Sequence, residues 1–293
     1  MQKKSKFIIA AVVTSVILIL LGAYYITSSP ETIAYLNIEK GKVEFNSGNG
    51  WQIAQDQMKL KENYAIRTLE DGQASVIFYE SEILELQPNT EINLTQISKQ
   101  NIEIEQKKGE SWSRVSKLTG TKQYEIKTPN SVATVRGTGF GVFISQESDE
   151  LLVDEGVVEC SFPNKTNTIQ TREFKICKIS RDKVIEEEIT KEHLILIRQK
   201  VEKSIILLKT IQLREIKKNK VLLRIIKGRY NATDEDVVNF IEDINTGEID
   251  LEKVKQKIPF RARPIEKIIM ISEKINALNK RLEIIDNKIA SME

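Results

Sequence analysis

The pattern of hydrophobic and polar positions divides the chain into three parts. Residues 7–26 form one apolar run without a charged side chain. Over residues 31–183, hydrophobic and polar residues tend to alternate, which is typical of half-buried β-strands. Over residues 184–293, hydrophobic residues recur every three to five positions, which predicts amphipathic helices. The sequence therefore predicts an apolar segment within residues 1–30, followed by a β domain and a helical region.

The β domain is predicted to contain many short strands. Strict alternation occurs at residues 91–94 and 101–105. Turn-forming residues, mainly glycine, asparagine, aspartate and proline, separate such stretches at short intervals. Together with the helices that follow, this pattern predicts a mainly β plus α protein. Its β domain is expected to be a sandwich, a roll or a short solenoid.

The apolar run predicts a single-pass membrane anchor. Residues 7–26 number twenty, and at ~1.5 Å per residue a helix of that length crosses a hydrocarbon layer of ~30 Å. Three lysines precede the run and the next basic residue is Lys40, which places the N-terminus in the cytoplasm and the rest outside it. A cleaved signal peptide is the alternative. The run is longer than the usual ~7–15-residue core of a signal peptide, and Tyr24 and Tyr25 stand where small residues are needed for cleavage.

The last segment carries a heptad pattern. Its hydrophobic residues are spaced alternately three and four positions apart, at Ile268, Ile271, Ile275, Leu278, Leu282, Ile285 and Ile289. Such a seam packs equally well in two ways. It can form an intramolecular hairpin with the predicted helix over 194–216, or it can mediate self-association through 268–289 as a coiled coil.

The first part of the helical region is strongly basic. Residues 198–229 contain eleven basic and two acidic side chains. This surface could contact anionic lipid or a wall polymer, or it could face the acidic stretch at residues 147–159. It could also be a solvated helix face. Nucleic acid is not an expected partner on the outer side of a membrane.

Composition argues against an enzyme. The whole chain has 44 basic and 42 acidic residues, one histidine and two cysteines, so its net charge indicates no partner and its acid–base chemistry is sparse. No nucleotide-binding, nucleophile or metal-ligand motif is found, and no cofactor or metal is expected. Cys160 and Cys177 flank a predicted hairpin. Outside the cytoplasm they could form a disulfide, and two buried thiols are the alternative.

One motif has a specific pattern, over residues 128–144. It contains a threonine–proline pair and a valine–arginine–glycine–threonine run, and it resembles the signature of the FecR domain. Eight residues fall on that signature in register: Thr128, Pro129, Val135, Arg136, Gly137, Thr138, Phe140 and Val142. None of them is a nucleophile, base or metal ligand, so a structural role is expected. The alternative is that Arg136 and the backbone N–H groups of the glycine turn hold an anion.

The resemblance to the FecR domain extends over about residues 36–160. It implies a bacterial protein and an extracytoplasmic domain that receives a signal, as in transducers that act on a sigma factor. Two departures weaken the iron-signalling part of that implication. Only six residues precede the apolar run, where the transducers carry a cytoplasmic anti-sigma domain. The part after the β domain is helical, whereas the transducers carry a small α/β domain there.

These observations lead to a functional expectation. The chain is expected to be anchored in the bacterial inner membrane through residues 7–26, with its bulk in the periplasm. There it would act as a non-enzymatic sensing or protein-interaction module with an unidentified envelope partner. One alternative is a structural envelope protein that binds cell-wall glycan. Another is a regulator of iron-uptake sigma-factor signalling that works through a separate partner.

Overall fold

A computed structural model describes residues 34–79, 82–98, 100–115, 123–135, 137–220, 224, 227–228, 231–257 and 263–292. All of them belong to one compact unit, Ile33–Glu293. The predicted anchor at residues 7–26 lies outside the described residues. Within these residues, no helix combines the length and the apolar character that a membrane crossing requires.

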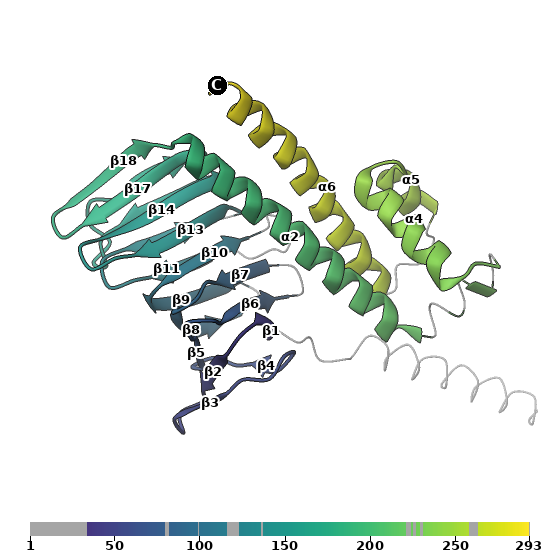
Figure 1. The fold of residues 1–293 in the computed structure, drawn as a ribbon, viewed down its shortest axis with the longest axis horizontal. Coiled ribbons are helices and arrows are strands. Elements are labelled where there is room, and N and C mark those ends of the chain that lie inside the picture. The colour runs from purple at the N-terminus through teal and green to yellow at the C-terminus, as the bar shows by residue number, and fades with distance from the viewer. Residues whose placement is uncertain are drawn as a thin grey trace, which may run out of the picture. The chain divides into compact units, whose positions relative to one another are not determined.

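The β domain consists of two sheets, each with nine strands in the described part of the chain (Figure 1). We call them sheet A and sheet B. The order in sheet A is β18 (Lys183–Glu188), β17 (Lys175–Ser180), β14 (Ser148–Glu155), β13 (Gly139–Ile144), β10 (Glu110–Arg114), β7 (Glu82–Leu86), β6 (Gln73–Phe78), β1 (Ala34–Lys40) and β4 (Lys59–Leu60). The order in sheet B is β16 (Ile169–Arg172), β15 (Val157–Ser161), β12 (Val132–Val135), β11 (Gln123–Lys127), β9 (Asn101–Lys108), β8 (Glu91–Ile97), β5 (Ala65–Thr68), β2 (Val43–Asn46) and β3 (Trp51–Ile53).

The chain crosses repeatedly between the two sheets. It forms β6 and β7 in sheet A, β8 and β9 in sheet B, and β10 in sheet A, and it continues in this way to β18. Each excursion adds strands next to the previous ones, so the sandwich grows along one direction as a solenoid does. Strands β9 and β11 pair in parallel, whereas the other described ladders are antiparallel. The structure therefore combines two of the predicted alternatives, the sandwich and the solenoid.

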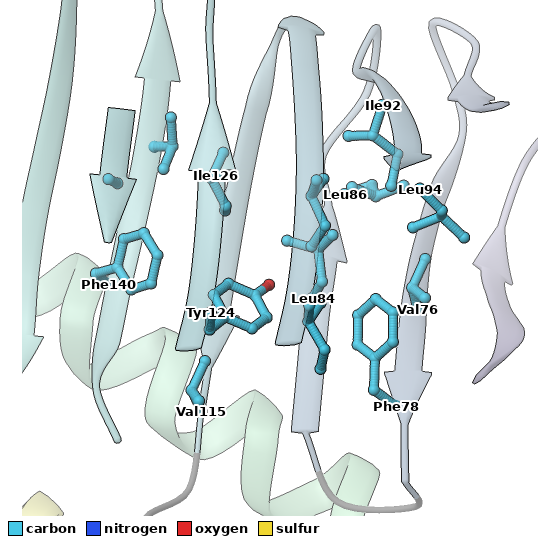
Figure 2. Close-up of a cluster of buried hydrophobic side chains, with 14 of the residues drawn as sticks. Val76, Phe78, Leu84, Leu86, Ile92, Leu94, Val115, Tyr124, Ile126 and Phe140 are labelled. Carbon is cyan, nitrogen blue, oxygen red and sulfur yellow. The ribbon is translucent and has the colours of Figure 1, made fainter. Parts of the chain in front are cut away.

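The main hydrophobic core lies between the sheets, where the inward side chains of the alternating strands meet (Figure 2). In β8, for example, Ile92 and Leu94 are buried in this core, while Glu91 and Asn93 lie on the other face. This is the period-two pattern that the sequence predicted, and it arises because successive side chains of a strand point to opposite faces.

A second core covers the outer face of sheet A. The helices that the structure describes are α2 (Lys191–Lys218), α4 (Asp234–Thr246), α5 (Leu251–Lys257) and α6 (Arg263–Ala290). Helices α2 and α6 lie side by side, and their apolar side chains pack with outward residues of sheet A (Figure 1). The sheet contributes Ile77, Ile83, Trp112, Leu152 and Ile176 to this cluster, and the turn before β17 contributes Phe174. The helical region is thus part of the same folded unit as the sandwich.

The heptad seam of α6 is used within the chain. Ile271, Ile275, Leu278 and Ile285 are buried in the cluster that contains α2 and sheet A. The structure therefore adopts the intramolecular hairpin. Self-association through 268–289 would require the seam to leave this contact.

The helix boundaries follow local chemistry. Thr190 caps the start of α2. Thr233 and Asp236 form a capping box at the start of α4, where a threonine followed by three acidic residues predicts a capped helix. Gly247 ends α4 with a φ of 85°, a left-handed conformation that glycine adopts readily. The predicted boundary between the β and helical regions, at residues 183/184, lies at the start of β18. The β region therefore extends to Glu188 in the structure.

The sequence predicts that Trp51, Phe78, Trp112 and Phe140 lie in the core, and one of these predictions needs correction. Phe78, Trp112 and Phe140 are buried as expected, but Trp51 is only half-buried on the edge strand β3. The guanidinium of Arg67 lies 4.1 Å above its ring. An edge strand has no neighbour on one side, so its side chains are less enclosed.

Candidate functional site

The first half of the signature motif forms a tight turn between β11 and β12. The backbone N–H groups of Asn130 and Ser131 donate to Thr128 Oγ1 at 3.2 and 2.8 Å. The buried carboxylate of Asp149, on β14, accepts from the Thr128 hydroxyl, from Ser131 Oγ at 2.9 Å and from Asn130 Nδ2 at 3.0 Å. Pro129 lies inside this turn. The threonine–proline pair therefore shapes a turn that a buried carboxylate holds.

The second half of the motif leads from β12 to β13. Val135 packs in the core between the sheets. Gly137 has a φ of 69°, a conformation that side chains with a Cβ rarely adopt. Thr138 is buried, and its carbonyl oxygen accepts from the N–H of Val115 at 2.9 Å. Arg136, the predicted anion contact, lies outside the described residues.

The aromatic end of the motif is a packing unit. Phe140 meets the ring of Tyr124 edge-on, with 6.3 Å between the ring centroids. Gly141 lies on the opposite face, where a Cβ atom would come within 2.5 Å of Trp112 Cε3. The glycine leaves room for Trp112, so the motif contributes to both hydrophobic cores.

A register shift between β13 and β14 places a carboxylate in the interface with the helices. Gly139 pairs with Glu155 and Phe140 pairs with Val153, so Asp154 is an extra residue between the two pairs. Such an irregularity re-aims a side chain. The Asp154 carboxylate is fully buried and lies on the side of sheet A that the helices cover.

Asp154 joins the β domain to α6 through two arginines. Arg114 Nη1, on β10, binds Asp154 Oδ2 at 2.6 Å, and Arg281 Nε, on α6, binds Oδ1 at 3.0 Å. Arg281 also donates to the carbonyl oxygen of Asp154 and to Glu173 Oε2, the latter at 3.1 Å. Its guanidinium lies 4.2 Å from the ring of Phe174. We call Arg114, Asp154 and Arg281 the arginine–aspartate cluster.

A second ionic contact joins α2 to sheet A. Glu85 on β7 is buried, and Lys200 and Lys203 of α2 approach it at 3.5 and 3.2 Å. Lys203 also binds Glu39 at 2.6 Å. Burial lowers the pKa of Lys200. Burial acts in the same direction on Lys203, but the carboxylates of Glu85 and Glu39 outweigh it and raise its pKa.

These contacts bear on the partners of the basic helix. Several basic residues of α2 form ion pairs with other elements. Lys203 pairs with Glu39 and Glu85 of sheet A, Lys209 pairs with Glu242 of α4, and Arg198 pairs with Asp286 of α6. None of these four ion pairs joins α2 to the acidic stretch at residues 147–159. Asp154 of that stretch pairs with α6 and β10 instead.

Lys274 of α6 is the most perturbed cation of the described interface. Its side chain is buried, and this desolvation lowers its pKa from 10.5 to about 7, while the charge of Glu82 on β7 opposes the shift. Glu82 also acts with burial to raise the pKa of Tyr124 well above its ordinary value. Buried ionisable side chains therefore lie both under the helices that cover sheet A and in the adjacent core.

The two cysteines lie close together as buried thiols. Cys160 is on β15 of sheet B, and Cys177 is on β17 of sheet A, so they face each other between the sheets. Burial raises the pKa of Cys160, and a hydrogen bond with Cys177 adds to this effect. The structure places them across the sandwich, whereas the sequence suggested partners across one hairpin. Both thiols are free here.

The outer face of sheet B carries a shallow polar hollow near the motif. It has a volume of about 430 Å³ and is lined by Gln123, Thr134, Val135, Val157, Glu159, Lys165 and Gln170. Beside it, the nearly buried carboxylate of Glu125 accepts from Lys165 at 3.0 Å and from Thr134 at 3.1 Å, and Lys127 lies 3.2 Å away. Burial opposes ionisation of Glu125, but the two lysines outweigh it and lower its pKa. This surface is therefore polar and ordered by ion pairs.

The ionisable groups of the interface mostly pair with one another. Among the described residues, no group of three or more His, Cys, Asp or Glu side chains is placed to hold a metal ion. His193 contributes to the cap of α2, where its Nδ1 accepts from the Thr190 N–H at 3.1 Å. The buried ionisable groups pair between elements and hold the helices on the sheet.

Sequence reasoning identified the motif but not its partners. These partners all lie outside the motif, at Arg114, Asp149, Asp154 and Arg281. A single charged residue in a strand or helix carries no periodic signal, so the sequence did not identify them. One sign was available for Asp154, because it directly precedes Glu155 and Gly156, two residues that match the end of the FecR pattern. Its contact with Arg281, 127 residues away, depends on the tertiary fold.

Comparisons with known proteins agree with the motif. Residues 64–159 match the family described as FecR protein. No curated protein matches the chain. Two crystal structures of a putative anti-sigma factor from Parabacteroides distasonis ATCC 8503 are similar at 16% and 17% identity. Each covers 45% of this chain, with TM-scores of 0.39 and 0.38, and this chain spans 63% and 64% of theirs.

The match to the family includes the turn at Thr128, the glycines of the second half of the motif and Asp154. It begins at β5 and ends within β15, so the helices that cover sheet A lie beyond it. This chain carries a FecR domain at residues 64–159.

Proposed function

We propose that the chain is a membrane-anchored, extracytoplasmic FecR-domain protein that acts as a non-enzymatic sensing and protein-interaction module. The observation that carries this proposal is the unequal use of the two sheet faces. The outer face of sheet A is covered by α2 and α6 of the same chain. The outer face of sheet B carries exposed polar residues and the hollow beside the motif. A partner would bind sheet B.

The structure supports a sensing role through its buried ionic contacts. The arginine–aspartate cluster connects β10 and β14 of the FecR domain to α6. A partner that shifts these strands would change the contacts of a helix outside the domain. Signalling to an iron-uptake sigma factor through a separate protein is a narrower form of this proposal.

The proposed partner face can be tested with photo-crosslinking residues in the native envelope. Crosslinkers would replace Thr95 and Gln170 on sheet B, and a matched crosslinker would replace exposed Ile206 on α2. We expect a discrete crosslinked protein from sheet B that is lost in the Glu159→Lys variant. Crosslinks from Ile206 alone would contradict the proposal, as would accessibility labelling that finds residues 31–183 in the cytoplasm.

A second candidate function is binding of cell-wall glycan. The hollow combines the amides of Gln123 and Gln170 with the carboxylate of Glu159, groups that can hydrogen-bond hydroxyls. A pull-down on insoluble peptidoglycan distinguishes the candidates. Retention that survives high salt and is lost in the Gln170→Ala variant would favour glycan, whereas release by salt would indicate an electrostatic contact.

A further inference from the structure

The C-terminal end of α2 and the residues after it carry exposed cations without acidic partners. Lys217, Lys220 and Arg224 are exposed and form no ion pair with any described residue. The sequence over residues 216–233 contains no acidic side chain. Earlier in α2, by contrast, Lys203 meets two carboxylates of sheet A. We call Lys217, Lys220 and Arg224 the basic corner.

The basic corner lies beside the first strand of the β domain. Arg214, about one turn before Lys217, donates from Nη2 to Asn37 Oδ1 on β1 at 3.1 Å. Strand β1 begins at Ala34, eight residues after the end of the apolar run at residues 7–26. Eight residues span at most about 28 Å when fully extended. The cations therefore gather where the chain enters the domain, within reach of the proposed anchor.

The other end of α2 lies away from this point and has the opposite charge. The helix begins next to β18, at the far edge of sheet A from β1, and crosses the sheet toward β1 (Figure 1). Residues 183–193 hold two basic and four acidic side chains, whereas residues 216–233 hold six basic side chains and no acidic one. A negatively charged surface would therefore attract only the end of α2 that lies beside β1.

We propose that the basic corner binds the phosphate groups of anionic phospholipids in the membrane that holds the anchor. This inference rests on the membrane anchor of the proposed function. Lipid is favoured over a wall polymer because the cations lie where the chain arrives from the bilayer. Docking holds the β1 end of the sandwich at the membrane. It leaves the outer face of sheet B, which carries no residue of the basic corner, open to a partner.

The test uses the full chain in lipid nanodiscs, with a fluorescent amino acid at one position. Gly228 suits this label, because it is exposed and a Cβ atom there would meet nothing within 4 Å. The matched label replaces Ile195, which is exposed near the start of α2. A phospholipid with a nitroxide on its headgroup quenches a label that approaches the membrane surface. Discs of phosphatidylcholine are compared with discs that also contain phosphatidylglycerol, at a constant fraction of the nitroxide lipid.

We expect phosphatidylglycerol to increase the quenching of the label at Gly228 but not of the label at Ile195. High salt should reverse the increase, because it screens exposed charges. The docking equilibrium follows from the dependence of quenching on the fraction of phosphatidylglycerol. The variant Lys217→Gln/Lys220→Gln/Arg224→Gln should lower it about 100-fold, since each cation near an anionic surface contributes about fivefold. These side chains are exposed, so the variant should still fold.

The matched control is Lys107→Gln/Lys108→Gln/Lys183→Gln, which removes the same charge from exposed residues of other strands. It should keep the quenching that depends on phosphatidylglycerol. Equal loss in both variants would overturn the proposal, because net charge alone would then explain the response. Equal quenching of the label at Gly228 in both lipids would overturn it as well.

Two further outcomes separate this inference from the functions proposed above. Retention on insoluble peptidoglycan that only the basic-corner variant loses, without any response to phosphatidylglycerol, would assign the cations to a wall polymer and overturn lipid binding. A chain that does not incorporate into nanodiscs of either lipid would contradict the anchored function itself. A chain that incorporates but shows no response to phosphatidylglycerol would contradict only the present proposal.

Discussion

At the scale of single residues, buried carboxylates organise the FecR domain. Asp149 collects three side-chain donors of the turn that opens the motif, and Asp154 collects two guanidiniums. Neither carboxylate is solvated, so each depends on its partners for stability. Their roles are to position loops and helices.

The Asp149→Ala variant tests the first of these roles. Removing the carboxylate leaves the hydroxyls of Thr128 and Ser131 without their acceptor in a buried turn. We expect the free energy of unfolding to fall by about 2–4 kcal/mol, measured by urea denaturation. The exposed Glu147→Ala variant is the control and should change it by less than about 0.5 kcal/mol. A loss below about 1 kcal/mol for Asp149→Ala would show that the turn forms without the carboxylate.

The lowered pKa of Lys274 implies that the stability of the folded chain depends on pH. Its pKa is about 7 in the folded protein and 10.5 ordinarily, so between these values the unfolded chain binds a proton that the folded chain releases. Stability therefore rises with pH across this window. We expect a contribution on the order of 3 kcal/mol between pH 7 and 9.5.

The Lys274→Met variant isolates this contribution. Urea denaturation of both chains at several pH values gives the difference in slope. The unmodified chain should gain more stability than the variant as pH rises above 7. Parallel curves would show that Lys274 keeps an ordinary pKa in the folded state.

At the scale of elements, strands under the helices lose the simple alternation. All five residues of β7 are buried, because one face meets sheet B and the other meets α2 and α6. Two of these residues are glutamates, and Glu85 meets lysines of α2. Edge strand β18 is protected differently. It exposes Glu186, Glu187 and Glu188, charges that oppose pairing with another sheet.

Helix α6 allows a direct test of the intramolecular hairpin. Ile275 is fully buried in the seam, whereas Ile284 is 49% exposed on the same helix. Ile275→Asp should lower the free energy of unfolding by about 4 kcal/mol or more, because it buries a carboxylate among apolar side chains. Ile284→Asp should change it by less than about 1 kcal/mol. If the seam instead joined two copies, Ile275→Asp would convert a dimer to a stable monomer in size-exclusion chromatography.

At the scale of the whole molecule, the two outer faces of the sandwich differ. Sheet A needs its helices, because its outer face carries Trp112 and several aliphatic side chains. The outer face of sheet B is mostly polar, and no described helix packs on it. The helices therefore complete the hydrophobic burial of a domain whose family match ends at residue 159.

A chain that ends after Glu188 tests this dependence. Without α2 and α6, the outer face of sheet A becomes a large exposed apolar patch, which promotes aggregation. In a Trp51→Phe background, we expect the emission of Trp112 to shift to longer wavelength and the binding of a hydrophobic dye to rise. A chain that ends after Ala290 keeps all helices and is the control. A monomeric truncated chain with unchanged Trp112 emission would show that the sandwich folds independently of its helices.

The sequence by itself determined the local features of this protein. Alternation predicted strands such as β8, and spacings of three to five residues predicted α2 and α6. The cap at Thr233 needed only neighbouring residues. The FecR motif could also be identified, because its residues are contiguous. These features depend on interactions within a few positions of the chain, so a single sequence contains their signal.

Only the tertiary structure decided which surfaces meet. The seam of α6 could have bound a second copy, and the cysteines could have belonged to one hairpin. The structure placed α6 against sheet A, and Cys160 across the core from Cys177. It also brought Arg281 to Asp154 and the lysines of α2 to Glu85. Charge and hydrophobicity show that a residue needs a partner, but the choice of partner depends on burial by segments that are distant in the sequence.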